Sequence, residues 1–361
     1  MNSYALPSID AWTASSLLQK AIRRGEADYA QAAALALYRM RGNALWRRLL
    51  LIAFEDVGPA DPALCVNVSE WSNDPELRKS LGTDHELLLY LTGEMCLAAK
   101  NREADYLICA AKQAPFSEDL RAAMASRSLE NRVLAAGDCN ATLLDRAVAS
   151  WMASGVNGGA PQVLREGNLS GLIRHFVALG VPEDFASSVA YASKKTSEPI
   201  VLMAPLLLLA IGRETSSARV VTEALPPSVL CNGIPSWVFD KHTRLGKSAV
   251  RQLLKENREV RDCLAAFVPE YKSIQVAEMA AFYADAVALS SRLVWPQSDE
   301  LYALGLRTDM TKIGTPDDGV APITQLLSQH LNQLNDIRKR LREGNRSEAF
   351  TRTVGMVGGG K

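Results

Sequence analysis

The sequence lacks the motifs by which many enzymes and metal proteins are recognised. It contains no nucleophile-elbow serine, no HExxH, no GxGxxG and no EF-hand loop. Its six cysteines form no CxxC pair, a pattern that is typical of reduced, buried thiols inside a cell and argues against zinc. The sequence therefore predicts neither a metal nor a cofactor, and it favours a binding role while leaving an enzyme open.

A surplus of charge and a hydrophobic run of membrane length are also missing. The 40 Lys and Arg residues balance the 40 Asp and Glu residues, so any contact with DNA would need a local basic patch. The most apolar run, residues 199–211, is shorter than the roughly 20 residues that cross a bilayer, and it contains Pro205. Because the N-terminus has no recognisable secretory signal, we expect a cytoplasmic protein without a membrane partner.

Alternation of polar and apolar residues is scarce, whereas apolar residues recur at intervals of three and four along most of the chain. This periodicity predicts an all-α, multi-helical fold in two helical subdomains built from short antiparallel helix pairs. A glycine-rich loop at residues 155–161 marks their boundary. The predicted parts are one domain at 1–154, a second at 161–307, a loop (308–322) plus an amphipathic C-terminal helix within 308–345, and a disordered tail at 346–361.

The most unusual local feature is an acidic turn at residues 55–58. Glu55 and Asp56 end an apolar helix, where two adjacent carboxylates oppose the negative end of the helix dipole. A cation must compensate them, and the candidates are Arg23, Arg47 and Arg48. We interpret the turn as a structural clasp or partner-docking element formed by Glu55, Asp56 and Arg48, with a metal-binding turn or a catalytic carboxylate pair as alternatives.

The acidic turn belongs to a longer pattern. The residues that carry it lie at 19–23 (QKAIR), 33–39, 47–49 (RRL), 55–58 (EDVG) and 60–62 (ADP). With them, residues 16–113 resemble the C-terminal region of the RarA/MgsA (WRNIP-type) AAA+ ATPases, a clamp-loader-collar-like module that follows the motor domain in that family. The chain departs from the family pattern at Phe54, at Pro59 and at residues 99–102.

The resemblance implies properties that composition does not. In the family this region holds subunits together as a tetramer, so we expect a homo-oligomer. The family acts in DNA replication, recombination and repair, which makes DNA and a separate ATPase or replication protein the expected partners. Because the chain contains no ATPase motif, ATP-driven activity does not follow from the resemblance.

A second polar block, at residues 237–248, invites a phosphate-binding interpretation. Its end, GKS at 246–248, imitates the close of a P-loop, but position 241 is lysine where that motif needs its first glycine. Asp240 and His242 could act as acid and base in an enzyme, or the cations of the block could form a phosphate-contacting surface. The candidate DNA or phosphate contacts are Arg23, Arg24, Arg47, Lys241, His242, Arg244 and Lys247.

These observations favour a non-catalytic, oligomeric adaptor or binding protein associated with DNA replication, recombination or repair. Two alternatives stay open. The first is a nucleic-acid- or nucleotide-processing enzyme that uses the segment Asp240-Lys241-His242-Thr243-Arg244. The second is an accessory protein of a mobile element or phage that engages a host replication factor.

Overall fold

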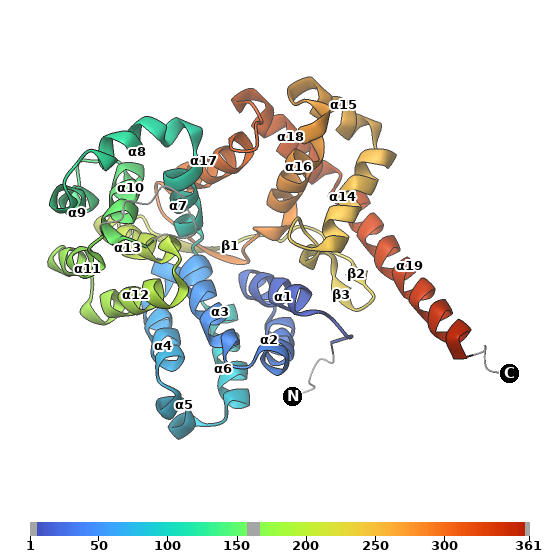
Figure 1. Cartoon of the computed structure of the whole chain (residues 1–361), viewed down its shortest axis with the longest axis horizontal. Helices are drawn as coiled ribbons and strands as arrows, with labels where there is room; N and C mark the ends of the chain where they lie inside the picture. The colour runs from blue at the N-terminus through green and yellow to red at the C-terminus, as the bar shows by residue number, and fades with distance from the viewer. Residues whose placement is uncertain (1–5, 157–166, 358–361) are drawn as a thin grey trace.

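The computed structural model describes residues 6–156 and 167–357, and the side chains of residues 6–156 and 167–344. Helices dominate this part of the chain, so the predicted all-α, multi-helical fold is confirmed. The α-helices run from α1 to α19, and strands form only two short two-stranded ribbons in the described residues (Figure 1).

The helices before the first strand make up the N-terminal half. They are α1 (Ala11–Arg24), α2 (Ala27–Arg41), α3 (Ala44–Ile52), α4 (Pro62–Asn73), α5 (Pro75–Leu81), α6 (Asp84–Leu97), α7 (Glu103–Gln113), α8 (Glu118–Ala125), α9 (Leu129–Gly137), α10 (Leu143–Ser154), α11 (Leu169–Ala178), α12 (Glu183–Thr196) and α13 (Met203–Arg213). Single π-helical and 3₁₀ turns link some of them: η1 (Ala53–Val57), η2 (Gly58–Ala60), η3 (Pro115–Ser117) and η4 (Pro199–Leu202).

The C-terminal half contains the strands and the remaining helices. The strands are β1 (Arg219–Thr222), β2 (Leu230–Cys231), β3 (Ile234–Pro235) and β4 (Ser291–Val294). The helices and turns are η5 (Ser236–Val238), α14 (Arg244–Glu256), α15 (Arg258–Phe267), α16 (Glu270–Ala281), η6 (Phe282–Ala286), α17 (Ser298–Thr311), α18 (Asp317–Gln329) and α19 (Leu331–Val357).

Two hydrophobic cores hold these helices together. The larger core takes residues from α1–α4 and α6–α13 and includes Trp237 and Trp295 from later segments. The smaller core lies among α14–α19 and includes Tyr106 of α7. The boundary predicted near residue 155 does not divide the core, because Trp151 of α10 and Phe176 of α11 share one cluster. A glycine-rich composition shows where two helices are connected, but it does not show whether those helices pack in the same core. Residues 157–161 of that loop lie outside the described chain.

The two halves lie side by side in Figure 1, with α17 crossing onto α7 and α19 projecting from the body. Two ribbons lie near the junction. Strand β1 pairs antiparallel with β4, and β2 pairs with β3 through a turn at Asn232 and Gly233, which have φ of 51° and 78°. Positive φ at both turn residues is what a two-residue type I′ hairpin requires.

The most apolar run of the sequence is buried in the larger core. It forms η4 and then α13, and Pro205 lies in the first turn of α13, where its missing N–H removes no helical hydrogen bond. Leu206 and Leu207 are fully buried. Among the described helices, none is long and apolar enough to cross a membrane.

The C-terminal part differs from its prediction. The expected loop at 308–322 is wrong, because α17 continues to Thr311 and α18 begins at Asp317. Two acids in the first turn of α18 favour that helix start, and Pro322 is tolerated inside it at the cost of one hydrogen bond. The single helix expected after that loop is divided at His330, and α19 continues to Val357 where a disordered tail was predicted. Residues 358–361 lie outside the described chain.

Helices α7 and α17 pack so closely that a glycine is needed between them. A Cβ on Gly305 would lie 2.4 Å from Tyr106 Cδ1. We expect Gly305→Ala to lower the free energy of unfolding by about 1–3 kcal/mol, because Tyr106 or a whole helix must move. Gly212→Ala in α13 is the control, since nothing lies within 4 Å of its added Cβ and alanine should raise stability by up to about 1 kcal/mol. Urea unfolding measures both changes, and equal effects would contradict the packing argument.

Candidate functional site

A π-helical turn positions the two carboxylates of the acidic turn. Helix α3 continues directly into η1, which contains Glu55 and Asp56, and the chain then reverses at Gly58 with φ of 50° and ψ of −124°. Such turns are rare and are often found at functional sites. Asp56 is fully buried and Glu55 is half-buried, so both need partners inside the protein.

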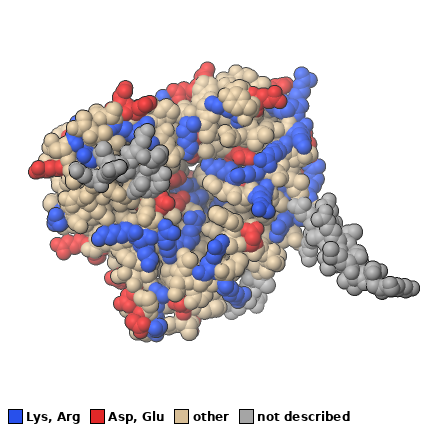
Figure 2. Space-filling model, viewed as in Figure 1, with Lys and Arg blue, Asp and Glu red and all other residues tan. Residues whose placement is uncertain are grey.

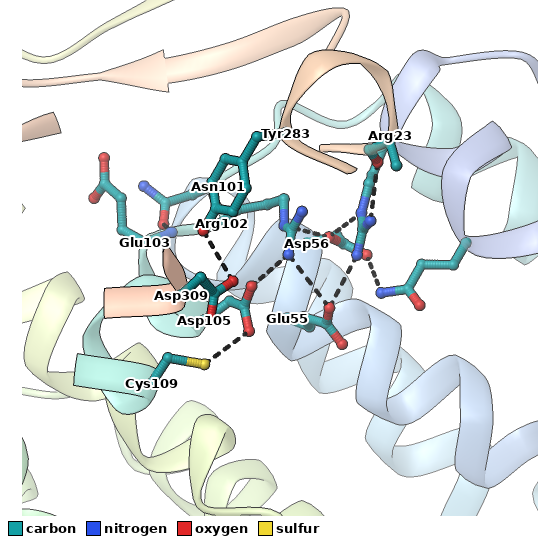
Figure 3. A network of polar contacts seen from close by, with 12 residues as sticks. Arg23, Glu55, Asp56, Asn101, Arg102, Glu103, Asp105, Cys109, Tyr283 and Asp309 are labelled. Carbon is teal, nitrogen blue, oxygen red and sulfur yellow. Dashed lines mark hydrogen bonds and ion pairs between the residues drawn. The ribbon is translucent and has the colours of Figure 1, made fainter. Parts of the chain in front are cut away.

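Two arginines from separate segments of the chain supply those partners (Figure 3). Arg23 of α1 places Nε 2.6 Å from Asp56 Oδ1 and Nη2 2.9 Å from Glu55 Oε1. Arg102, which precedes α7, lies 3.3 Å from Asp56 and 3.7 Å from Glu55, and its Nη2 also donates to Asp105 at 2.5 Å. We call these five residues the clasp.

The predicted partner Arg48 reaches the clasp only through Gln19. Arg48 Nη2 donates to Gln19 Oε1, and Gln19 Nε2 donates to Asp56 Oδ2 at 2.8 Å. Arg23 was among the cations predicted from the sequence, whereas Arg102 was not. Its one sign in the sequence is its position directly before a helix whose first turn contains acids.

The charges of the clasp compensate one another. Burial raises the pKa of Glu55, and the neighbouring Asp56 carboxylate raises it further against the opposing effect of Arg23. Burial alone would lower the pKa of Arg102, but Asp105 and the other acids of the clasp hold it well above its usual value. These ion pairs connect α1, η1 and the start of α7. The charged side chains of the clasp are thus engaged with one another inside the protein.

The same face of α1 also binds the C-terminal half. Lys20 Nζ lies 2.8 Å from Asp240 Oδ2, Arg23 Nη1 donates to Ala286 O at 3.2 Å, and Arg24 Nη2 donates to Pro226 O at 3.1 Å. Both arginines are buried, with 3% and 6% of their surface exposed. The prediction that Arg23 and Arg24 contact phosphates is therefore corrected, because helical periodicity places these cations on one face but does not say whether that face is solvated.

The polar block at 237–248 forms part of this junction. Asp240 is buried, and its Oδ1 accepts the backbone N–H of His242 at 3.0 Å while its other oxygen faces Lys20. Burial would raise the pKa of Asp240, but Lys20 outweighs this effect and the pKa is lowered. The carboxylate and the imidazole therefore do not form an acid/base pair, since the imidazole packs edge-to-face on Phe282 at 5.7 Å.

The other residues of this block are divided between the interior and the surface. Lys241 Nζ lies over the Phe282 ring at 4.3 Å. The glycine of the GKS sequence has a packing role, because a Cβ on Gly246 would lie 2.1 Å from Asp240 O. His242, Arg244 and Lys247 are exposed, so the structure leaves these three accessible to a ligand.

Arg47 is exposed on a different part of the surface. Its guanidinium donates to the carbonyls of Lys195 at 3.0 Å and Thr196 at 2.6 Å, which end α12. Lys194 and Lys195 are exposed beside it, and the ion pairs found among the described residues include none of the three cations. We call Arg47, Lys194 and Lys195 the α12 basic patch.

The distribution of charge agrees with such a local patch. Figure 2 shows that lysine and arginine side chains predominate along the middle of one face, while most acids lie toward its edge. Within the described residues, no group of three His, Cys, Asp or Glu side chains is arranged to hold a metal ion.

Lys100 is a buried cation that the sequence analysis did not single out. Its Nζ donates to Cys96 O at 3.1 Å and to Ala98 O, so it satisfies the C-terminal end of α6. Its backbone N–H donates to Ser291 O of β4 at 2.8 Å. Burial lowers the pKa of Lys100 to about 8.

Asp56 is the acid on which the clasp depends most. We expect Asp56→Asn to lower the free energy of unfolding by about 3–5 kcal/mol, because two buried arginines lose a negative partner of the same shape. Glu76→Gln is the matched control, since it removes one charge from an exposed pair with Lys79 and should cost less than about 1 kcal/mol. Chemical denaturation with both variants tests this, and similar small losses would show that the clasp contributes little to stability.

The depressed pKa of Lys100 gives a second prediction. Between pH 8 and 10.5 the unfolded chain binds a proton at this residue that the folded chain has lost, so the Lys100 contribution to the free energy of unfolding should rise with pH by about 3 kcal/mol in total. The measurement is the difference between wild type and Lys100→Met in denaturation across this range. A difference that does not change with pH would contradict it.

Comparison of the chain with models of protein families, with curated proteins and with solved structures gave no match in any of the three. The resemblance of residues 16–113 to the RarA-like C-terminal region thus remains an expectation from the sequence.

Proposed function

We propose that this protein is a non-catalytic, oligomeric adaptor of DNA replication, recombination or repair, and that it binds the DNA backbone through the α12 basic patch. The observation that carries the proposal is the grouping of Arg47 with Lys194 and Lys195. Three exposed cations without an intramolecular ion pair among the described residues can release counterions when they meet phosphates. The patch also explains how a chain of zero net charge could bind DNA.

The polar residues that could have supported catalysis have structural partners. Glu55 and Asp56 are paired with arginines, and Asp240 is paired with Lys20. Cys109 is the thiol nearest the clasp, with Sγ 3.8 Å from Asp105 Oδ1, and burial raises its pKa well above the usual value. Because a neutral thiol and paired carboxylates are poor nucleophiles and bases, binding has more support than the alternative of an enzyme that uses residues 240–244.

Self-association is the second part of the proposal. The resemblance to the RarA-like module implies a tetramer, with a separate ATPase or replication protein as a further partner. Tyr90 and Leu97 support a contact surface on α6, since they lie two turns apart on one face and are 59% and 78% exposed.

DNA binding is tested by fluorescence anisotropy over a salt series with a labelled duplex. We expect Lys194→Ala/Lys195→Ala to weaken binding about tenfold and to reduce the slope of log affinity against log salt by about two, because two phosphate contacts are lost. Lys79→Ala/Arg258→Ala is the control. It removes the same charge from exposed residues that form local helical pairs elsewhere and should leave binding close to that of wild type.

Light scattering on the same material fixes its mass. Duplex binding that is equally weak in both double variants would show a nonspecific charge effect and overturn the assignment of the patch. A monomer at micromolar concentration would contradict the oligomeric part, whereas an oligomer without DNA affinity would point to protein partners alone.

A further inference from the structure

A hollow of about 670 Å³ lies where the start of α1, the start of α14 and α19 meet, within the volume range of small-molecule sites. In Figure 1, α14 and α19 lie to the right of α1, and α14 packs directly on α19. The hollow includes His242 and Arg244 from the predicted phosphate surface. It does not include Asp240 or Lys247.

Positive charge predominates in the hollow. Arg244 is exposed, and Arg342 lies over the Phe239 ring with its guanidinium carbon 5.8 Å from the centroid. Neither arginine forms an ion pair with a described residue. The one acid of the lining, Asp10, is engaged as the N-cap of α1, where it accepts the Thr13 N–H at 2.8 Å.

The start of α14 adds to this field. Thr243 caps the helix by accepting the Gly246 N–H at 3.1 Å. The backbone N–H groups of Arg244 and Leu245 lie in the first turn of α14, where the helix itself provides no carbonyl to accept them. They can therefore donate to an anion at the positive end of the helix dipole. Two guanidinium groups and a helix N-terminus thus converge on one space, which suits a phosphate.

Trp12 forms the aromatic part of the hollow. It is 75% exposed, whereas the other indoles are buried or, for Trp71, packed on Tyr90. Exposing so large an apolar ring is costly unless it has a partner. His242 also lines the hollow, and the desolvation of its ring, which packs on Phe282, lowers its pKa.

We propose that this hollow binds a single unpaired nucleotide, with the base stacked on Trp12 and the phosphate held by Arg244, Arg342 and the N-terminus of α14. The bases of a duplex are stacked on one another and are not available to the indole. The ligand is therefore a free nucleotide or a nucleotide within a single strand. The site shares no residue with the α12 basic patch, so this proposal is independent of the proposed binding of duplex DNA.

Tryptophan fluorescence of the full chain tests the proposal. Titration with an oligothymidylate and, separately, with thymidine monophosphate should change the emission and reduce quenching by acrylamide, because Trp12 is the one indole that is mostly exposed among the described residues. Trp12→Ala should abolish the signal and weaken oligonucleotide binding, followed by anisotropy, about five- to hundredfold, because the stacking face is lost. Arg244→Ala should weaken it at least about fivefold, whereas Arg258→Ala, an exposed arginine of α15, should not.

The two ligands distinguish the two sources of the nucleotide. Binding of both shows that a free nucleotide suffices, and binding of the oligonucleotide alone shows that a strand is needed. The proposal is overturned if neither ligand alters the emission, or if Trp12→Ala binds the oligonucleotide as wild type does. Duplex binding that depends on Lys194 and Lys195 would remain intact in the Trp12→Ala variant, which separates the two proposals.

Discussion

The arrangement of the two halves depends on the contacts that Arg23 makes. Its guanidinium binds Asp56 in the π-helical turn η1 and, through another nitrogen, the carbonyl of Ala286 in the π-helical turn η6. A π turn leaves its backbone groups out of register with the regular helical ladder, and a planar fork of donors can satisfy a carboxylate and a carbonyl at once. One side chain of α1 thereby fixes two irregular turns that lie far apart in the sequence.

The junction around Arg23 is polar although both cores beside it are apolar. Lys20 with Asp240 and Arg338 with Asp285 continue the pattern, and burial raises the pKa of Asp285 against the effect of Arg338. Buried ion pairs contribute little net stability, because desolvation offsets their attraction, but a displaced partner leaves an uncompensated charge. Any other packing of the two halves would leave buried charges without partners. We therefore infer that this polar layer selects one relative position of the halves and adds little to the free energy of unfolding.

The sequence allowed the fold class and part of the clasp to be predicted, for physical reasons that also set the limits. Helical periodicity shows in single segments, and adjacent carboxylates at a helix end require a cation, which brought Arg23 into consideration. The choice of Arg102 depends on how α7 approaches η1, and this is set by tertiary packing. The segment at 308–322 was misread because proline, aspartate and glycine are common both in loops and in the first turn of a helix.

Burial, more than residue type, decides which cations can meet a ligand. Arg23 and Arg47 look alike in the sequence, yet the first is enclosed by acids and the second lies open at the end of α12. Helix α1 carries Trp12 at its start and the clasp arginine near its end, while α3 carries Arg47 and leads into η1. Because Arg23 pairs with Glu55 and Asp56, the clasp joins the helix that carries Trp12 to the helix that carries Arg47.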